Sequence, residues 1–356
     1  MMEILNKIFQ DKFAKLAFMV LLVLYILILF ADFIAPYSNT YSNRDASYAP
    51  PSQIYTIDES GKLSRPYTYN YVRRYDPALM QTVYKEDRCK KHYLRLLPKG
   101  EGYKFFGIIP THRHLFGTND GGELYLLGTD INGRDVFSRL LFGGRISMTI
   151  GFLSLFIVFP IGLLYGGISG YFGGILDTVM MRFAEAIMAI PSFYLLIILA
   201  AILPSGMTST QRFALIVVIL ALIGWAGFAR VVRGMVLSIK EEEFVQSAKI
   251  MGASSLRIIL KHVIPQTTSY VIIAMTLSVP SYILAESGLS FLGLGIQQPD
   301  ASWGNMLKEA QEFTNILYRP WLLAPGGLIF IAVLSFNLLG DAIRDILDPK
   351  SIMRKS

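Results

Sequence analysis

The stretch FALIVVILALIGWAGFA, residues 213–229, has no charged side chain at any of its 17 positions. An α-helix needs about 20 largely apolar residues, with a range of about 17–25, to cross the hydrocarbon core of a bilayer. This stretch therefore predicts a membrane-spanning helix.

The composition of the whole chain agrees with a membrane protein. Of its 356 residues 53% are hydrophobic and only 17% are charged, whereas ordinary soluble domains have about 25% charged residues. The mean hydropathy is +0.45. These values disfavour a cytosolic enzyme and a disordered protein. A single cysteine, Cys89, excludes an intrachain disulfide, and His112 and His114 have no third ligand nearby in the sequence, so we expect no metal site.

Five further stretches are free of charge over a similar length. They are Leu16–Ala31, Ser147–Tyr165, Ala186–Leu203, Val263–Ala285 and Trp321–Gly340. The sequence therefore predicts an all-α membrane protein with six transmembrane helices, and Pro191 and Pro280 are expected to kink two of them. The first stretch could be a signal peptide, but it is long, and Phe30, Asp32 and Phe33 stand where small residues should precede a cleavage site. We therefore expect a retained anchor.

Positive charges in short segments predict the orientation, because such segments stay in the cytoplasm. Cations gather at the N-terminus, between spans four and five, and at the C-terminus. They are Lys7, Lys12, Lys15, Arg230, Arg233, Lys240, Lys249, Arg257, Lys261, Arg344, Lys350, Arg354 and Lys355. We expect both termini to be cytoplasmic, and this bias accounts for the net charge of +7 without nucleic-acid binding.

The long segment between the first two spans is then outside. Ile54–Ile57, a polar turn and Pro66–Tyr69 have the pattern of a strand, a turn and a strand, and Tyr103–Ile109 is a candidate for another strand. We expect a small β-containing domain that binds substrate or rests on a partner protein.

Two glycine-containing stretches lack what a nucleotide site needs. Gly128–Asp135 has two glycines but no following Lys-Ser/Thr pair, and Gly293-Leu-Gly295 lacks a third glycine. We expect this chain to bind no ATP, no magnesium and no other cofactor, and to have no catalytic residues.

The cytoplasmic loop at residues 240–265 has helical periodicity. Phe244, Ala248 and Met251 fall on one face of a helix that Gly252 would end. Ser254 or Ser255 can cap a second short helix through Leu256, Ile259 and Leu260. Such a pair could lie on lipid headgroups or enter a groove on a partner protein.

This loop resembles the "EAA" loop of permease subunits of bacterial ABC importers, which reads Glu-Ala-Ala, three residues and Gly. Here Gln246 and Ser247 replace Glu and the first Ala, whereas Ala248, Gly252 and Pro265 match. Two more motifs are similar to the C-type permease of dipeptide and oligopeptide importers, and the resemblance covers residues 127–349. They contain Gly128, Thr129, Asp130, Gly133, Arg134 and Asp135, and then Asp341, Arg344, Asp345, Asp348 and Pro349.

The resemblance implies a permease of the type I importer fold in a bacterial inner membrane. A homologous permease, two P-loop ATPases that bind ATP and Mg²⁺, and an external solute-binding protein would be its partners. The helix at residues 243–252 would couple to one ATPase. Four parts are then expected: residues 1–36 with the first span, an extracytoplasmic insertion at 37–126, the permease core at 127–349 and a tail at 350–356.

The family that this chain resembles contains importers of more than one class of substrate. Peptides are expected, and relatives that carry nickel or oligosaccharide are the alternative within the family. Glu185 and Glu286 stand inside or beside spans, so either they face the translocation pathway or they are hydrated or bonded to neighbouring helices. Two other classes fit less well: a six-span receptor or scaffold, for which no output domain is visible, and an intramembrane enzyme, for which no catalytic pair lies in a span.

Overall fold

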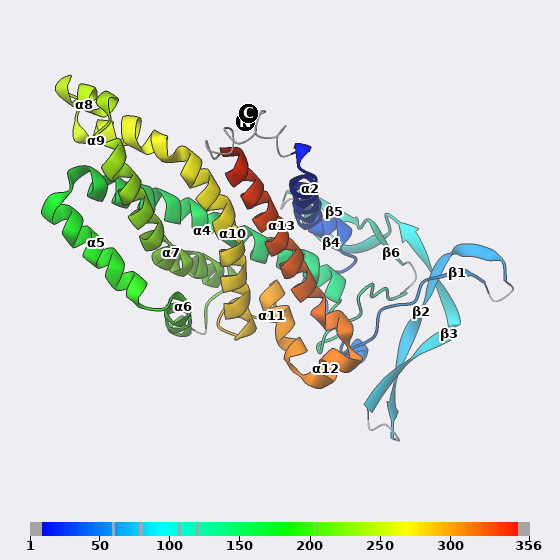
Figure 1. Cartoon of the computed structure of the whole chain (residues 1–356). Helices are drawn as coiled ribbons and strands as arrows, with labels where there is room; N and C mark the ends of the chain where they lie inside the picture. The colour runs from blue at the N-terminus through cyan, green and yellow to red at the C-terminus, as the bar shows by residue number, and fades with distance from the viewer. Residues whose placement is uncertain are drawn as a thin grey trace. The chain divides into compact units, whose positions relative to one another are not determined.

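The computed structural model describes residues 9–58, 61–77, 81–105, 108–118, 121–204 and 206–347 (Figure 1). The chain forms two compact units. Within the described residues, unit 1 contains 9–21, 148–289 and 330–347, and unit 2 contains 22–147 and 290–329. Each unit is therefore built from segments that are far apart in the sequence.

Five helical segments in the described part of the chain are long and apolar enough to cross a membrane. They are α2 (Lys12–Leu29), α4 (Val136–Phe172), α7 (Ser209–Ile239), the segment Ser255–Phe291 with α10 (Thr268–Phe291), and the segment Pro320–Leu347 with α13 (Ala324–Leu347). They contain five of the six expected spans. The helices run past the uncharged stretches, because lack of charge marks the membrane-compatible part and not the helix ends.

The third expected span is a bent pair of helices. Helix α5 (Gly174–Ala189) and α6 (Ser192–Ala201) meet at an angle of 79°. Ile190 is extended and Pro191 begins the new direction, because a residue before proline avoids the helical region. The bend is sharper than the kink expected at Pro191, and the count of six spans stays a prediction.

Shorter elements connect these helices. They are α3 (Ala31–Ile34), η1 (Arg44–Ala46), α8 (Glu243–Ile250), α9 (Ser255–Ile258), η2 (Ile259–Val263), η3 (Ile264–Thr267), α11 (Trp303–Leu307), η4 (Lys308–Gln311), α12 (Phe313–Tyr318) and η5 (Pro320–Leu323). In unit 1, α8 and α9 lie beyond the end of α7, and α6 lies near its beginning (Figure 1).

Three glycines allow α4 and α7 to pack closely in unit 1. Gly162, Gly166 and Gly170 recur every four residues and so lie on one face of α4. A Cβ atom at Gly166 would overlap the backbone oxygen of Ala229, and one at Gly170 would lie 2.8 Å from the backbone oxygen of Arg233. Small residues at this spacing let helix backbones approach in membranes, where dispersion contacts drive helix association.

An ion pair joins a third helix, α5, to α4 and α7. Arg233 of α7 donates from Nε to Oδ1 of Asp177 on α5 at 3.0 Å, and Ser169 of α4 donates to the same oxygen at 2.5 Å. Asp177 is 8% exposed. Because a charge in an apolar environment needs a partner, this contact fixes which faces of the three helices meet.

The β structure of unit 2 is a four-stranded antiparallel sheet and a separate hairpin. The sheet has the order β1 (Tyr55–Ile57), β2 (Leu63–Asp76), β3 (Gln81–Leu96) and β6 (Phe116–Thr118), and the hairpin pairs β4 (Lys99–Phe105) with β5 (Ile109–Arg113). Strands β1 and β2 lie where a strand, a turn and a strand were expected, although Glu59 and Ser60 of the turn are outside the described residues. Tyr103–Ile109 is not one strand, since β4 ends and β5 begins inside it.

Tyrosines form much of the sheet's packing. Tyr67 is 2% exposed, and its ring contacts those of Tyr55, Tyr69 and Tyr93 at centroid distances of 5.6–6.0 Å. The chain after β5 is joined to the segment that follows α2, because Leu115 donates its N–H to the Phe33 oxygen at 2.7 Å. The tyrosine-rich sequence therefore builds a packed sheet and not a loose linker.

The loop at residues 128–135 lies against the segment 43–49 in unit 2. Gly133 has a φ of +69°, and a Cβ atom there would overlap the Asn43 oxygen, so the turn requires glycine for both reasons. Thr129 is fully buried and donates its N–H to Ala49 at 2.9 Å. Trp321 donates from its ring nitrogen to the Thr129 oxygen at 3.0 Å.

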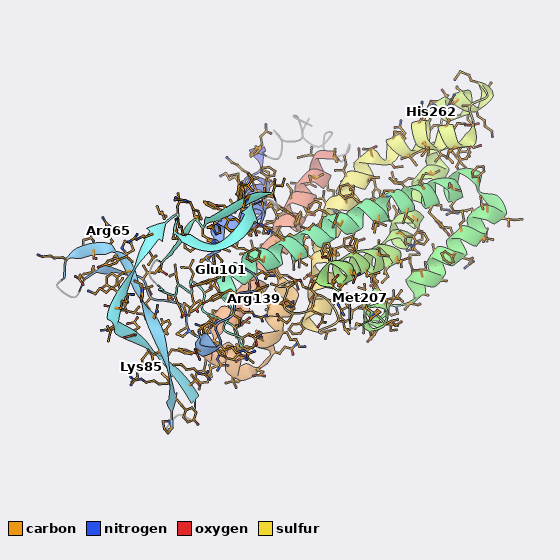
Figure 2. All side chains as sticks on the ribbon, turned by 180° about the vertical axis from the view of Figure 1, so that it is seen from behind. Arg65, Lys85, Glu101, Arg139, Met207 and His262 are labelled. Atoms are coloured by element: carbon orange, nitrogen blue, oxygen red, sulfur yellow. The ribbon has the colours of Figure 1, made fainter. Side chains whose placement is uncertain are left out.

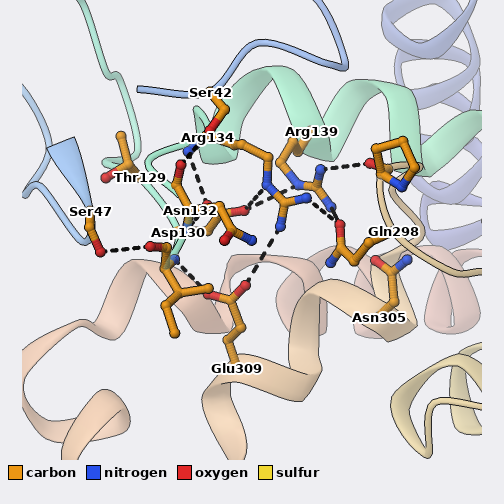
Figure 3. A network of polar contacts seen from close by, with 12 residues as sticks. Ser42, Ser47, Thr129, Asp130, Asn132, Arg134, Arg139, Gln298, Asn305 and Glu309 are labelled. Atoms are coloured by element: carbon orange, nitrogen blue, oxygen red, sulfur yellow. Dashed lines mark hydrogen bonds and ion pairs between the residues drawn. The ribbon is translucent and has the colours of Figure 1, made fainter. Parts of the chain in front are cut away.

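A buried ion cluster joins this loop to residues 298–309 (Figure 3). Arg134 Nε binds Asp130 at 2.6 Å, and Arg139 approaches the same carboxylate at 3.5 Å. Both guanidinium groups donate to the side-chain oxygen of Gln298. Glu309 lies 3.9 Å from Arg134 and accepts the Ile131 N–H at 3.0 Å.

Asp135 sits beside this cluster as the N-terminal cap of α4. Its Oδ2 accepts the N–H and the hydroxyl of Ser138 at 2.7 and 2.6 Å, which satisfies a backbone donor of the first turn. Burial outweighs these bonds and raises the pKa of Asp135 to about 7. Burial also raises the pKa of Glu309 well above its usual range.

The glycine contact predicts that Gly166→Leu destabilises unit 1. The new side chain cannot fit against Ala229, so α4 and α7 must separate, at a cost of about 1–3 kcal/mol or more. Gly327→Leu is the control, because a Cβ atom at Gly327 meets nothing within 4 Å. Thermal unfolding in detergent should show a lower midpoint for the first variant alone; equal midpoints would contradict the packing described.

The raised pKa values predict that stability falls as the pH rises from about 4 to about 7. In this window the folded protein holds a proton on Asp135 that the unfolded chain has released. Across the window, Asp135 lowers the free energy of unfolding by on the order of 4 kcal/mol. Asp135→Asn should reduce the slope of unfolding free energy against pH, whereas Glu312→Gln, at an exposed position, should not. Denaturant unfolding at several pH values measures this; an unchanged slope in the first variant would refute it.

Candidate functional site

The loop at residues 240–265 forms one end of unit 1; we call it the coupling loop after the role that the family resemblance implies. It contains α8, α9 and the turns η2 and η3. Figure 2 places His262 of this loop at one end of the unit and Met207, in the connection before α7, towards the other. Helix α7 therefore has the coupling loop at only one of its ends.

A glycine-terminated turn fixes the angle between α8 and α9. Gly252 has a φ of +81°, its N–H donates to Lys249 at 3.1 Å, and the Ala253 N–H donates to Ala248 at 3.1 Å. These two bonds form a Schellman motif, which satisfies the last carbonyls of a helix and favours glycine at its left-handed position. The helix end expected at Gly252 is where the structure has it.

The apolar face of α8 differs from the expected one. Phe244 and Met251 are 41% and 80% exposed, but Ala248 is 2% exposed, because α9 and η2 pack against α8 and cover it. The three residues therefore do not form one exposed surface. Ile250, which does not belong to the expected face, is 87% exposed, and Leu256 and Leu260 after it are 58% and 45% exposed.

The second short helix is also shorter than expected. Helix α9 ends at Ile258, and Ile259 and Leu260 belong to the wider turn of η2. Ser254 occupies the capping position, but its side chain makes no capping hydrogen bond. Ile258 and Ile259 are adjacent in sequence and both buried. The wider turn of η2 thus packs two consecutive side chains inward.

Gln246 ties α8 back to the end of α7. Its side-chain nitrogen donates to the backbone oxygen of Lys240 at 2.9 Å. A carboxylate could not donate this bond, so the replacement of glutamate by Gln246 fits the local geometry. Lys240 in turn donates from Nζ to the Gly170 oxygen at 3.2 Å. Ser247 and Pro265 are exposed.

The two candidate carboxylates of the pathway have different environments. Glu286 of α10 is fully buried, whereas the side chain of Glu185 is 45% exposed and lies 2.9 Å from Arg182 in the same helix. An exposed pair of this kind contributes little stability. A role of either carboxylate in the pathway stays a prediction.

The C-terminal motif falls at the end of α13. Asp341, Arg344 and Asp345 are in its last two turns and are exposed. Arg344 there suits the negative end of the helix dipole. Asp348 and Pro349, like the cations at residues 1–8 and 350–356, lie outside the described residues.

Sequence reasoning missed the partners of the charged motif residues. Arg134 and Arg139 both donate to Gln298, and Arg134 also lies 3.9 Å from Glu309. These partners come more than 150 residues later in the sequence and have no periodic relation to the arginines. The sequence offered one signal: two arginines lie within six residues, shortly before an uncharged stretch. Arginines that are buried at such a place need oxygen acceptors from elsewhere in the chain.

Two family descriptions match this chain. "Binding-protein-dependent transport system inner membrane component" matches residues 140–352, and "N-terminal TM domain of oligopeptide transport permease C" matches residues 1–51. The resemblance stated from the three motifs is thereby confirmed.

Named relatives agree with this assignment. The dipeptide transport system permease protein DppC of Bacillus subtilis (strain 168) is 45% identical over 63% of this chain and 68% of its own length. The oligopeptide transport system permease protein OppC of the same organism is 41% identical over 63% and 71%.

A solved structure titled "Crystal structure of an amino acid ABC transporter with histidines" is similar with a TM-score of 0.41 and 17% identity, over 59% of this chain and 94% of the other. With several apolar helices and a family match over more than half its length, the chain belongs to the binding-protein-dependent transport system inner membrane components and is a multi-pass membrane protein.

Proposed function

We propose that this chain is the permease subunit of an ATP-driven peptide importer. Its relatives are named for dipeptide and oligopeptide transport, which supports a peptide substrate. In this proposal it forms half of the translocation pathway with a homologous permease. Two ATPase subunits bind ATP and Mg²⁺, and an external solute-binding protein delivers the substrate.

The coupling loop is the observation that carries the proposal. Exposed Phe244 and Ile250 lie on α8, and exposed Met251 follows at its C-terminal cap. The Schellman turn and the Gln246 bond hold this helix at a fixed angle. An exposed apolar surface on a rigid element is what a groove on a partner protein can bind. The proposed partner is one of the two ATPases.

Transport then follows from the connection of α8 to the helices beside it. When ATP closes the ATPases, the groove that holds α8 moves. The loop follows directly after α7 and leads into α10, so a displacement of α8 would tilt these two helices. Two arrangements of the pathway, inward-open and outward-open, are the states whose populations the nucleotide shifts.

The topology completes the proposal. We place the coupling loop and both termini in the cytoplasm and the sheets of residues 55–118 outside, where they contact the binding protein or the partner permease. The chain itself is proposed to hold no nucleotide or metal, because residues 128–135 lack the Lys-Ser/Thr pair of a phosphate-binding loop.

Gly252→Val should leave the protein in the membrane and release the ATPases. A β-branched residue with a positive φ costs about 1–2 kcal/mol, so the turn rearranges and α8 loses its angle. Met251→Asp should act similarly by placing a charge on the surface to be buried. Co-purification of the ATPases with tagged permease, together with peptide uptake, measures both effects.

The matched control is Gly121→Val, which changes another glycine with a positive φ and open space around its Cβ position outside the coupling loop. It should retain the ATPases. Normal ATPase recovery and normal uptake in both loop variants would leave the loop as a membrane-surface helix and refute its coupling role.

Cysteine labelling tests the topology, because Cys89 is the one cysteine and is exposed on β3. A membrane-impermeant maleimide should label it in right-side-out vesicles. Asp87 raises the pKa of the thiol, so labelling should accelerate as the pH rises above neutrality. In a Cys89→Ser background, Ser254→Cys should react only after the vesicles are opened; labelling in sealed vesicles would overturn the orientation.

A further inference from the structure

A cavity of about 300 Å³ lies between α4, α7 and α10 in unit 1. Helix α10 lines it with residues that recur at helical spacing, Tyr270, Ala274, Ser278 and Ser281. Helix α7 contributes Gly224, Gly227 and Phe228. The volume is at the lower end of the range of small-ligand pockets.

The lining combines apolar residues with four residues that carry hydroxyls, and it has no charge. Hydroxyl groups of Tyr270, Ser278, Ser281 and Tyr282 line the cavity, and its lining includes no Asp, Glu, Lys, Arg or His. All four residues belong to α10, which also carries hydroxyls outside the lining, at Thr268, Ser269, Thr276, Ser287 and Ser290. The Ser278 hydroxyl donates to the Ala274 backbone oxygen at 2.7 Å, so towards the cavity its oxygen can act only as an acceptor.

Two glycines of α7 line the cavity, and the room left by their missing Cβ atoms is used differently. A Cβ atom at Gly224 would overlap the Tyr282 hydroxyl, so the tyrosine lies directly over the α7 backbone. A Cβ atom at Gly227 would meet only the sulfur of Met188, at 3.9 Å. The side of α7 that faces the cavity is therefore open at Gly227 and presents backbone there.

A peptide backbone fits this chemistry. It offers N–H donors and carbonyl acceptors in alternation, and a hydroxyl can both donate and accept. Phe159 and Phe228, whose rings are 4.2 Å apart between centroids, give the cavity an apolar wall for side chains of different size. A charged side chain finds no ionic partner and no ionic repulsion.

We propose that this cavity binds the translocated peptide through its backbone hydrogen-bonding groups, so that uptake does not depend on the charge of the peptide's side chains. The inference rests on the peptide importer proposed above and adds the place and the kind of recognition. Glu185 and Glu286 are not among the residues that line the cavity.

The first test places a charge in the cavity. In cells whose peptide uptake depends on this chain, the wild type should take up tri-alanine, Ala-Glu-Ala and Ala-Lys-Ala at similar rates when each is saturating for the binding protein. Ser281→Asp, at an exposed position of the lining, should raise the ratio of Ala-Lys-Ala to Ala-Glu-Ala uptake about tenfold. Gly234→Asp, seven residues beyond Gly227 on α7 and outside the lining, should leave the ratio unchanged.

The second test fills the cavity. Gly227→Leu should lower uptake of all three peptides alike, by about tenfold, while the ATPases still co-purify. Gly234→Leu is the matched control, because a Cβ atom there has nothing within 4 Å and the same change is made in the same helix.

The outcomes separate this inference from the function on which it rests. If the Gly227→Leu variant loses the ATPases, the uptake ratio of Ala-Lys-Ala to Ala-Glu-Ala in Ser281→Asp decides alone whether the cavity binds the peptide. That ratio can be measured as long as the complex assembles. An unchanged ratio in Ser281→Asp, with wild-type uptake intact, would overturn the cavity as the peptide site. No dependence of peptide uptake on the wild-type chain would overturn the proposed function itself.

Discussion

The close approach of α4 and α7 is the constraint on which the rest of unit 1 depends. Gly166 and Gly170 bring the α4 backbone against Ala229 and Arg233, and this places Ser169 where it can bind the Asp177–Arg233 pair. One stretch of α7 thus packs against α4 and α5, while its neighbouring residues line the cavity and its end bonds to the coupling loop through Gln246. A movement of α8 would therefore be transmitted to a packed group of helices, because in the described part of the chain no flexible linker separates α8 from α7.

Unit 2 is held together by buried ion pairs and hydrogen bonds around one loop. Its loop at residues 128–135 is anchored by Gly133, and the two arginines of that region find buried oxygen acceptors from residues 298–309. Removing one partner of such a cluster would leave a buried charge alone, which costs more than the pair contributes. Geometry and charge together explain why the loop has glycine, aspartate and arginine at close spacing.

Much of the architecture could be predicted from the sequence, because charge-free stretches and the family motifs are local signals. Five spans, the helix end at Gly252 and the strands around residues 55–69 follow from such signals. The 79° bend at Pro191 could not, since a proline predicts a break and not its angle. The burial of Ala248 depends on how α9 and η2 pack back against α8, and the partners Gln298 and Glu309 come from a segment more than 150 residues after the arginines. No periodic pattern in the sequence indicates either contact.

The discontinuity of unit 2 has a consequence for the order of events during synthesis. Arg134 and its acceptor Gln298 are 164 residues apart, so a ribosome that adds about 5–20 residues per second needs on the order of 8–30 s between them. Throughout that interval the arginines beside α4 have no acceptor from the later segment. The ion cluster can therefore close only after the residues of α4, α5, α6, α7 and α10 have been synthesised.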